Sequence, residues 1–228
     1  VQAAIGAVNA VAFDISAACA GFIFAMNIVE GFFKAGIYKT ALIIGAETLS
    51  KVTDWSDRGT CVLFGDGAGA AVLKAEETGI IDMMMGADGT KGNVLACTSR
   101  TVGNFLTGTK PELGFMTMDG QEVFKFAVRK VPESVMELLQ RTGTKKEDIK
   151  YYVLHQANER IIEAAARRLK EPMEKFPMTI GQFGNTSTAS IPLLLDDMIQ
   201  KDMLKRGDKI IMSGFGAGMT WGAVLMEW

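Results

Sequence analysis

An internal repeat constrains the fold of this 228-residue chain more than any other feature of its sequence. Shifting the first part of the chain by 168 positions places the apolar run 41–45 on 209–213. The same shift places Cys19 on Ser187, and both residues stand at the head of a strongly apolar segment. Similarity at one fixed offset is typical of a duplicated structural unit, so we expect two βαβ-type copies that pack together.

The two copies differ by an insertion in the first. FGDGAGAAVL at 64–73 matches FGAGMTWGAVL at 215–225 with an offset of 151, so the first copy carries 168 − 151 = 17 additional residues, around 54–60. The second copy begins with a helix near Asp119, whose counterpart would stand at 119 − 168 = −49. We therefore expect about fifty residues of the first copy upstream of Val1, on a longer or a cleaved polypeptide.

Short apolar runs alternate with longer helical patterns, which is typical of an α/β protein. Residues 1–85 should form the C-terminal part of the first half, 86–118 a connecting loop region and 119–228 the second half. We expect strands within 10–16, 40–45, 60–74, 78–85, 151–155, 176–180 and 208–213, and helices at 19–35, 119–139, 157–170 and 187–204. Pro132 should kink or split the second of these helices.

Charge and rare residues exclude several classes of protein. Lys and Arg number 24 against 26 Asp and Glu, so a net charge of −2 argues against a general nucleic-acid binder. The single histidine excludes a His-rich metal site, and Cys19, Cys61 and Cys97 form neither a CxxC pattern nor a disulfide framework. No uncharged apolar run reaches about 18 residues, so we expect no membrane span. The odd number of cysteines fits a reducing, cytoplasmic compartment.

Cys19 lies in FDISAACAGF, where an expected strand passes into an expected helix. At the N-terminus of a helix, unpaired N–H groups and the helix dipole stabilise a thiolate and can also hold an oxyanion. The neighbouring Ala17, Ala18, Ala20 and Gly21 are small and leave room for a substrate. The alternative is an inert structural cysteine packed against small neighbours, which is the commoner situation.

Two other polar residues lie at comparable junctions. His155, in VLHQANERI, ends a strand before a helix, and Asn185, in FGNTSTASIP, precedes the second apolar helix. Each alone has a structural explanation, since a lone histidine is by default structural and asparagine is a common N-cap or turn residue. Active sites of α/β proteins gather at the C-terminal ends of strands, and a thiol, an imidazole and an amide together suit thioester chemistry.

The glycine-rich runs do not indicate nucleotide binding. FGDGAG at 64–69 and GFGAGM at 214–219 each precede a strand, whereas a dinucleotide fingerprint opens a helix, and there is no Walker pattern. Tight turns explain these runs, although the second can also offer an N–H to a substrate oxygen. Arg160 and Arg167 share a helix face that suits a phosphate or an acidic partner, or that is simply solvated.

Five motifs, in chain order, resemble one family of condensing enzymes. They are DISAACAGF, DRGT with FGDGAGAAVL, HQANERI, GNTSTASIP and GFGAGMTWGAVL, and they span nearly the whole chain. The chain is similar to β-ketoacyl-acyl carrier protein synthase III, the initiating condensing enzyme of type II fatty acid synthesis. This resemblance implies a thiolase fold with five αβαβα layers, whose first half is incomplete here. It also implies that an acyl-CoA primer, usually acetyl-CoA, condenses with malonyl-acyl carrier protein to give 3-ketoacyl-acyl carrier protein.

The resemblance implies roles for individual residues. Cys19 would be the nucleophile that the acyl-CoA acylates, and the N–H groups of Cys19 and Ala217 would hold the oxyanion. His155 Nε2 and the Asn185 amide would stabilise the enolate that forms when the malonyl group loses CO₂. The residues that would bind CoA or pantetheine are Arg58, Phe124 and Asn158. The basic surface that would dock acyl carrier protein is formed by Lys125, Arg160, Arg167 and Arg168.

The resemblance implies a homodimer and no tightly bound cofactor, because the coenzyme A thioester is a substrate. Two departures from the family stand out. The 228 residues do not include the family's N-terminal segment, with the tryptophan that usually stacks on the CoA adenine, and Ala217 replaces a common glycine. Two alternatives stay open. One is a starter condensing enzyme or acyltransferase of polyketide or secondary metabolism that uses the same cysteine. The other is an inactive fragment of a cleaved synthase.

Overall fold

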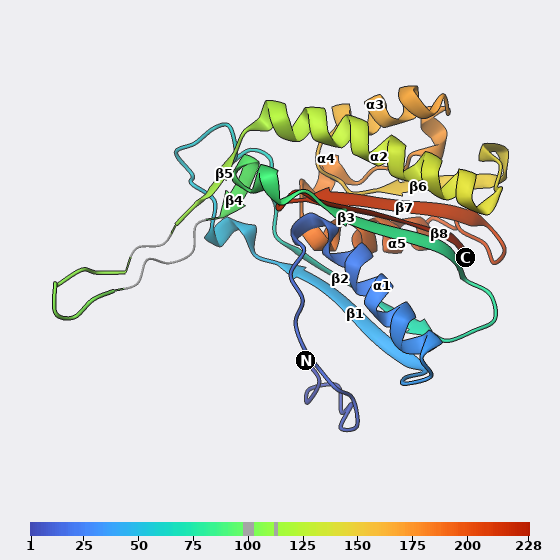
Figure 1. The fold of residues 1–228 in the computed structure, drawn as a ribbon, viewed down its shortest axis with the longest axis horizontal. Coiled ribbons are helices and arrows are strands. Elements are labelled where there is room, and N and C mark those ends of the chain that lie inside the picture. Colours follow the sequence, from blue (N-terminus) through green and yellow to red (C-terminus); the bar gives the residue numbers. More distant parts are fainter. Residues whose placement is uncertain (98–102, 112–113) are drawn as a thin grey trace.

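The computed structural model describes residues 1–97, 103–111 and 114–228. Its largest sheet has the strand order β3-β8-β7-β6 (Figure 1). These strands are β3 (Ile80–Ala87), β8 (Thr220–Glu227), β7 (Lys209–Gly216) and β6 (Ile149–Leu154). β6 and β7 run parallel, and the other neighbours are antiparallel. Helices cover this mixed sheet, which confirms the expected α/β class.

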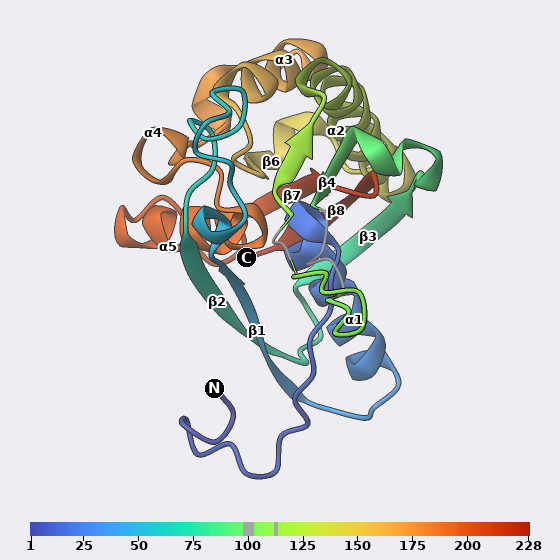
Figure 2. The same ribbon diagram turned by 90° about the vertical axis from the view of Figure 1, so that its left-hand side faces the viewer.

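Two smaller sheets complete the strands of the described residues. One pairs β1 (Thr40–Glu47) with β2 (Gly67–Lys74), and the other pairs β4 (Leu95–Cys97) with β5 (Met116–Met118). The helices α1 (Gly21–Lys34) and α5 (Ser190–Gln200) lie between the β1–β2 sheet and the four-stranded sheet (Figure 2). Each follows a short 3₁₀ turn, η1 (Ala18–Ala20) before α1 and η6 (Ser187–Ala189) before α5.

Two further helices cover the opposite face of the four-stranded sheet (Figure 1). They are α2 (Gly120–Thr142) and α3 (Glu159–Leu169), and the single-turn α4 (Ile180–Phe183) follows them. The remaining 3₁₀ turns are η2 (Leu49–Lys51), η3 (Gly89–Val94), η4 (Lys146–Asp148) and η5 (Met173–Lys175). Apolar side chains, including Phe126 and Ile211, fill the space between the four-stranded sheet and the helices α2 and α3. Others, including Phe22 and Val224, fill the space between the four-stranded sheet and the β1–β2 sheet. Burying each such side chain contributes about 1.5–3 kcal/mol to folding.

The start and end of α2 follow from its sequence. The Asp119 carboxylate accepts hydrogen bonds from the N–H groups of Gln121 and Glu122, both at 3.1 Å, and so caps the first turn. Gly143, at φ 67°, ends the helix in the left-handed conformation that glycine adopts readily.

Pro132 does not split α2, contrary to one of the expected outcomes. Proline has no N–H, so the carbonyl four residues earlier, that of Val128, loses its helical partner. Arg168 of α3 donates a hydrogen bond from its guanidinium to this carbonyl at 3.1 Å. The neighbouring helix therefore satisfies the group that Pro132 leaves free.

The element bounds recur along the chain as the repeat predicts, with a small correction to the offset. β1 and β7 are related by an offset of 209 − 40 = 169, and β2 and β8 by 220 − 67 = 153. Both hairpins share one register, since Thr40 pairs with Lys74 as Lys209 pairs with Glu227. The offset of 169 makes Thr188, rather than Ser187, the counterpart of Cys19.

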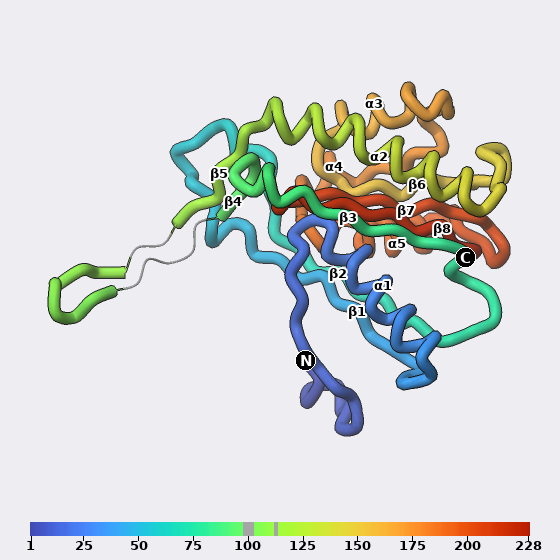
Figure 3. The backbone as a smooth tube through the Cα atoms, viewed as in Figure 1, coloured from blue at the N-terminus to red at the C-terminus, as the bar shows by residue number. Residues whose placement is uncertain are grey.

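The strand expected at 10–16 is wrong. This segment is irregular, and its apolar side chains Val11, Phe13 and Ile15 are exposed. In Figure 3 the N-terminal tube lies outside the sheets, and the Phe13 ring meets Phe32 of α1 edge-on, with 6.4 Å between the ring centroids. A strand needs a neighbour that pairs with its backbone, and none of the described segments pairs with residues 10–16. The apolar alternation alone therefore does not produce a strand here.

The strand expected at 176–180 is also wrong. Phe176 is buried because its ring stacks on Tyr152, with 4.8 Å between the ring centroids. Thr179 donates its N–H to the side chain of Gln156 at 3.0 Å, and α4 begins at the next residue. The apolar pattern thus reflects burial of a loop rather than sheet pairing. Among the residues described, no helix is long and apolar enough to span a membrane.

Candidate active site

Cys19 occupies the 3₁₀ turn that leads into α1, and its side chain is only 7% exposed. The end of β7 passes directly beside this turn. A Cβ atom at Gly216 would lie 2.6 Å from the Cys19 nitrogen, and one at Gly214 would lie 3.3 Å from the Cys19 carbonyl oxygen. Glycine is therefore required for the strand to approach the cysteine this closely. Gly214 and Gly216 of the GFGAGM run thus allow the backbone of β7 to lie close to the backbone of Cys19.

Burial raises the pKa of the Cys19 thiol to about 11. Desolvation is the largest cause, because a thiolate loses its hydration in the protein interior. A hydrogen bond with the Ser187 side chain acts in the opposite direction, and the negative charge of Glu47 adds to the increase. The backbone N–H at Cys19 also lowers this pKa, as expected for the start of a helix, but its effect is smaller than that of desolvation. In this environment the resting form is the thiol, because desolvation outweighs the N–H groups of the turn.

His155 follows β6 and lies beside β7 at the edge where Cys19 sits. Its backbone N–H donates to the Ser213 carbonyl at 2.8 Å, and its imidazole ring meets the Phe215 ring edge-on, with 5.5 Å between the ring centroids. A Cβ atom at Gly214 would lie 3.7 Å from the His155 Cβ, so Cys19 and His155 flank the same residue of β7.

The His155 imidazole is 2% exposed, and this burial lowers its pKa to about 3. The ring is therefore neutral near pH 7 and is a poor base. Its Nδ1 lies 2.6 Å from the Ser190 hydroxyl. Among the described residues, no hydrogen bond engages Nε2.

Asn185 precedes the 3₁₀ turn η6, and its amide is oriented by that turn. Its Oδ1 accepts the N–H of Ser187 at 2.9 Å. The Asn185 backbone pairs with Leu63 at 2.8 Å and with Gly65 at 2.9 Å, which holds the residue in place. Oδ1 must be the acceptor, so the Nδ2 donors point to the remaining side of the amide, and none of the described residues accepts from them. The expected turn role of this asparagine is thus observed, and it leaves the amide donors available.

The structure brings Cys19, His155 and Asn185 together through shared neighbours. Cys19 and His155 both lie next to Gly214, while Ser187 bonds to the Cys19 thiol through its side chain and to Asn185 through its N–H. The site therefore presents a thiol, a neutral imidazole and an amide at the C-terminal end of β7. A nucleophile next to two uncharged hydrogen-bond donors can form a thioester and stabilise a developing enolate.

Ala217 follows β7, in the turn that leads to β8. The Thr220 hydroxyl lies 3.1 Å from the carbonyl oxygens of both Ala17 and Ala217. It thereby joins the segment that precedes Cys19 to the turn that carries Ala217. The two N–H groups expected to hold an oxyanion belong to segments that Thr220 fastens together.

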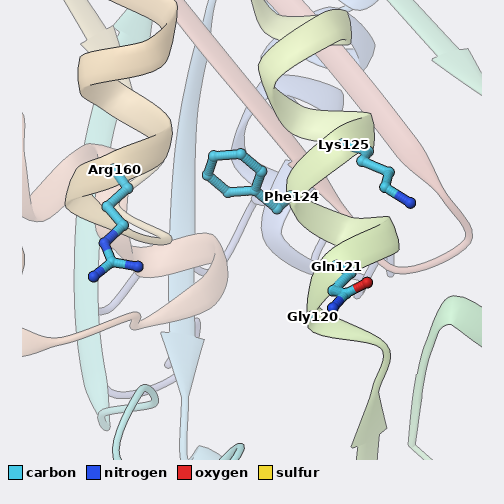
Figure 4. A pocket seen from close by; sticks show the side chains of 5 residues that line it. All are labelled: Gly120, Gln121, Phe124, Lys125 and Arg160. Carbon is cyan, nitrogen blue, oxygen red and sulfur yellow. The ribbon is translucent and has the colours of Figure 1, made fainter.

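A surface pocket of about 370 Å³ brings together three of the residues predicted to bind substrates. It is lined by Gly120, Gln121, Phe124, Lys125 and Arg160. Figure 4 shows the Phe124 ring between α2 and α3, facing the helix that carries Arg160, with Lys125 on the far side of α2. Lys125 pairs with Glu122 at 2.9 Å. Two cations thus flank an aromatic ring at the surface.

The other predicted binding residues have varied surroundings. Asn158 is the N-cap of α3 and accepts the Arg160 N–H at 2.9 Å, while Arg58 is exposed in the loop between η2 and β2. Arg167 pairs with Glu163 at 3.6 Å, one turn away on α3. Arg168 bonds to α2 beside Pro132, so its guanidinium already has a structural partner.

Three residues of the site do not stand out in the sequence, namely Ser187, Ser190 and Thr220. Each contacts the site through a hydroxyl whose partner lies far along the chain or in another element. For Ser187 and Ser190 the available signal is the polar run STAS at the head of an apolar helix, where hydroxyl residues are commonly read as helix caps.

The low pKa of His155 predicts a loss of stability in mild acid. Unfolding returns the imidazole to its ordinary pKa of 6.5. Below this pH the imidazole binds a proton in the unfolded chain, whereas in the folded chain it stays neutral down to about pH 3. The free energy of unfolding should therefore fall by about 2 kcal/mol between pH 8 and pH 5 from this residue alone. Urea unfolding of the wild type and of His155→Gln at pH 8 and at pH 5 measures this change in the free energy of unfolding. Equal pH dependences in the two proteins would contradict the buried neutral imidazole.

Comparisons with known proteins agree with these features. Residues 13–89 match the family described as 3-oxoacyl-[acyl-carrier-protein] synthase III, and residues 139–228 match the C-terminal part of the same family. The chain is 53% identical over 230 residues to a β-ketoacyl-[acyl-carrier-protein] synthase III of Clostridium novyi, covering 100% of this chain and 71% of that relative.

Solved structures show the same likeness in three dimensions. A 3-oxoacyl-[acyl-carrier-protein] synthase III from Aquifex aeolicus superposes with a TM-score of 0.90 at 44% identity, covering 100% of this chain and 70% of that one. The priming β-ketosynthase of the R1128 polyketide pathway superposes with a TM-score of 0.89 at 34% identity, covering 99% and 68%. The chain thus spans about 70% of the length of these proteins.

Proposed function

Because the chain belongs to the β-ketoacyl-acyl carrier protein synthase III family, the acyltransferases that initiate fatty acid synthesis, we propose that Cys19, His155 and Asn185 carry out its condensation. The observation that carries this proposal is their convergence on the end of β7, around Gly214 and Ser187. The family uses an acyl-CoA and malonyl-acyl carrier protein. We further propose acetyl-CoA as the primer.

In the first step, the Cys19 sulfur attacks the thioester carbonyl of the acyl-CoA. The thiol proton leaves with the displaced CoA thiolate, so an acyl-Cys19 thioester and free CoA are formed. Because the pKa of this thiol is about 11, the proton must leave as the sulfur attacks. The Ser187 hydroxyl supports this step, since its hydrogen bond favours the thiolate. The N–H groups of Cys19 and Ala217 hold the transient oxyanion.

In the second step, the malonyl thioester loses CO₂, and the electron pair of the broken C–C bond moves into an enolate. His155 Nε2–H and the Asn185 Nδ2–H donate hydrogen bonds to the enolate oxygen. The enolate carbon then attacks the acyl-Cys19 carbonyl, a new C–C bond forms, and the cysteine sulfur leaves. A neutral imidazole with a pKa of about 3 suits this task, because the step needs a donor that keeps its proton.

We propose that the carrier-protein substrate approaches over the pocket of Figure 4. Acyl carrier proteins are acidic, so Lys125 and Arg160 provide the complementary charge, with Arg167 further along α3. Arg168 contributes less, because its guanidinium is bonded to the Val128 carbonyl. Phe124 and Asn158 line the path of the pantetheine arm, and Arg58 meets the CoA nucleotide.

Replacing Arg160 by glutamate should raise the KM for malonyl-acyl carrier protein by about 10- to 100-fold, because an attractive charge at the docking surface becomes repulsive. The KM for acyl-CoA should change by less than about threefold, since small substrates do not need this surface. Steady-state kinetics with each substrate varied in turn measures both values. The control is Arg206→Glu, an exposed charge reversal before β7, at the opposite end of that strand from the site. An unchanged carrier-protein KM in Arg160→Glu would remove this residue from the docking surface.

We also propose that these 228 residues belong to the family's complete architecture. It consists of five αβαβα layers built from two related halves, with residues 1–85 in the first half, 86–118 connecting and 119–228 in the second. The shared register of the β1–β2 and β7–β8 hairpins supports the duplication. A homodimer is part of the same proposal.

Activity is tested by incubating the protein with acetyl-CoA and malonyl-acyl carrier protein and following 3-ketoacyl-acyl carrier protein by mass spectrometry. Formation of this product with release of one CO₂ per turnover supports the assignment. Acyl transfer to water or to another thiol, without a new C–C bond, would indicate a different acyltransferase.

A further inference from the structure

One contact of the site has no role in the mechanism above, namely the hydrogen bond between Ser190 and His155. The Ser190 hydroxyl lies 2.6 Å from His155 Nδ1, and both side chains are 2% exposed. Ser190 is the first residue of α5, whereas His155 follows β6, so the bond joins two elements 35 residues apart in the chain.

A second contact fixes the direction of this bond. The Gln156 N–H donates to the Ser190 oxygen at 3.3 Å, so the oxygen already acts as an acceptor. A serine hydroxyl has a single proton, and among the described residues His155 Nδ1 is the one acceptor within its reach. If Nδ1 carried a proton, the buried hydroxyl would have no acceptor, which costs about 1–3 kcal/mol. The hydroxyl therefore donates to Nδ1.

From this geometry we infer that Ser190 is a positioning residue that holds His155 in the tautomer protonated at Nε2. A neutral imidazole carries one N–H, so acceptance at Nδ1 leaves the proton on Nε2. The inference deepens the proposed function and rests on it, because only an Nε2–H can donate to the enolate oxygen. Without the serine, the proton is free to occupy Nδ1, and an unprotonated Nε2 repels the enolate.

The internal repeat shows that the helix start does not require this hydroxyl. With the offset of 169, the counterpart of Ser190 is Gly21, which begins α1 without any side chain. The same 3₁₀-to-α junction is therefore built in both copies, and the hydroxyl occurs in the copy that faces the histidine. This separates the role of Ser190 from helix capping.

Nitrogen-15 NMR tests the tautomer directly, because His155 is the single histidine of the chain. Protein labelled at histidine, and purified without a histidine tag, should show a protonated Nε2 and an unprotonated Nδ1 near pH 7. In Ser190→Ala the signals should shift towards the Nδ1-protonated form. A wild-type spectrum with a protonated Nδ1 overturns the inference, and so does a Ser190→Ala spectrum that is identical to the wild type.

Kinetic measurements distinguish a loss of His155 positioning from a general disturbance of the active site. Ser190→Ala should lower the rate of malonyl-acyl carrier protein decarboxylation by about 10- to 100-fold, while Cys19 acylation by acetyl-CoA changes less than about threefold. Ser190→Thr, which keeps the hydroxyl, should restore the Nε2-protonated spectrum. The matched control is Ser134→Ala, which removes an equally buried hydroxyl that bonds to the Lys130 carbonyl at 2.8 Å in α2. It should change neither the spectrum nor the ratio of the two rates.

The two proposals fail in different ways. If His155→Ala retains decarboxylation, the role of the histidine in the proposed function is wrong, whatever the tautomer. If His155→Ala loses decarboxylation but Ser190→Ala retains both the rate and the wild-type spectrum, the inference about Ser190 alone is wrong.

Discussion

Replacing Cys19 by serine should abolish acylation of the protein by acyl-CoA and lower the rate of condensation by about 10⁴- to 10⁶-fold. Serine fills nearly the same buried space, so the fold should persist. A serine hydroxyl is much harder to ionise than a thiol, and His155, with a pKa of about 3, is too weak a base to activate it. In the described part of the chain no second thiol lies in this turn, because Cys61 and Cys97 belong to other segments.

Intact-mass spectrometry before and after incubation with acetyl-CoA measures the acylation. The wild type should gain the mass of one acetyl group per chain, and Cys19→Ser should gain none. Cys61→Ser is the matched control, since it makes the same substitution at a partly buried cysteine outside the site. Acetylation that persists in Cys19→Ser would assign the nucleophile to another residue.

Removing either enolate donor should separate the two steps of the reaction. In His155→Ala and in Asn185→Ala, decarboxylation of malonyl-acyl carrier protein should fall by about 10²- to 10³-fold, because each variant loses one hydrogen bond to the developing charge. Acylation of Cys19 should change by less than about tenfold, since the oxyanion of that step is assigned to backbone N–H groups. The double variant should lose less than the product of the single effects, because the two donors act on one oxygen.

Single-turnover acylation and release of labelled CO₂ measure the two steps independently. His155→Gln is a useful companion to the alanine variant, because it keeps an amide donor and should retain part of the decarboxylation. Equal losses in both steps for His155→Ala would contradict the division of roles and would point to a general disturbance of the buried site.

Much of the fold could be read from local patterns. Gly143 marks the end of α2, Asp119 caps its start, and the apolar run 41–45 lies inside β1. The predictions of strands at 10–16 and 176–180 were wrong for a common reason. An apolar run is compatible with burial in a loop as well as with pairing in a sheet, and the local pattern does not distinguish the two. Phe176 is buried against Tyr152 in a loop, and residues 10–16 find no pairing segment among the residues described.

The candidate site divides in the same way. The positions of Cys19, His155 and Asn185 at segment junctions were readable, because strand ends and helix starts have local signals. The direction of the thiol pKa was not readable, since the local turn favours a thiolate while burial, decided by the packing of β7, favours the thiol. The hydrogen bond of Arg168 was not readable either, since Pro132, 36 positions earlier, leaves the Val128 carbonyl free to accept it.

The sequence by itself determined the α/β class, the repeat, the chemical identity of the three central residues and the family they indicate. Only the tertiary structure decided which hydroxyl groups form hydrogen bonds with the residues of the site. Ser190 meets His155, and Thr220 joins Ala17 to Ala217, across separations of 35 and 203 residues. The physical reason is that residue type and spacing act over one or two turns of the chain. Desolvation and hydrogen-bond direction instead depend on every group that folding brings into contact.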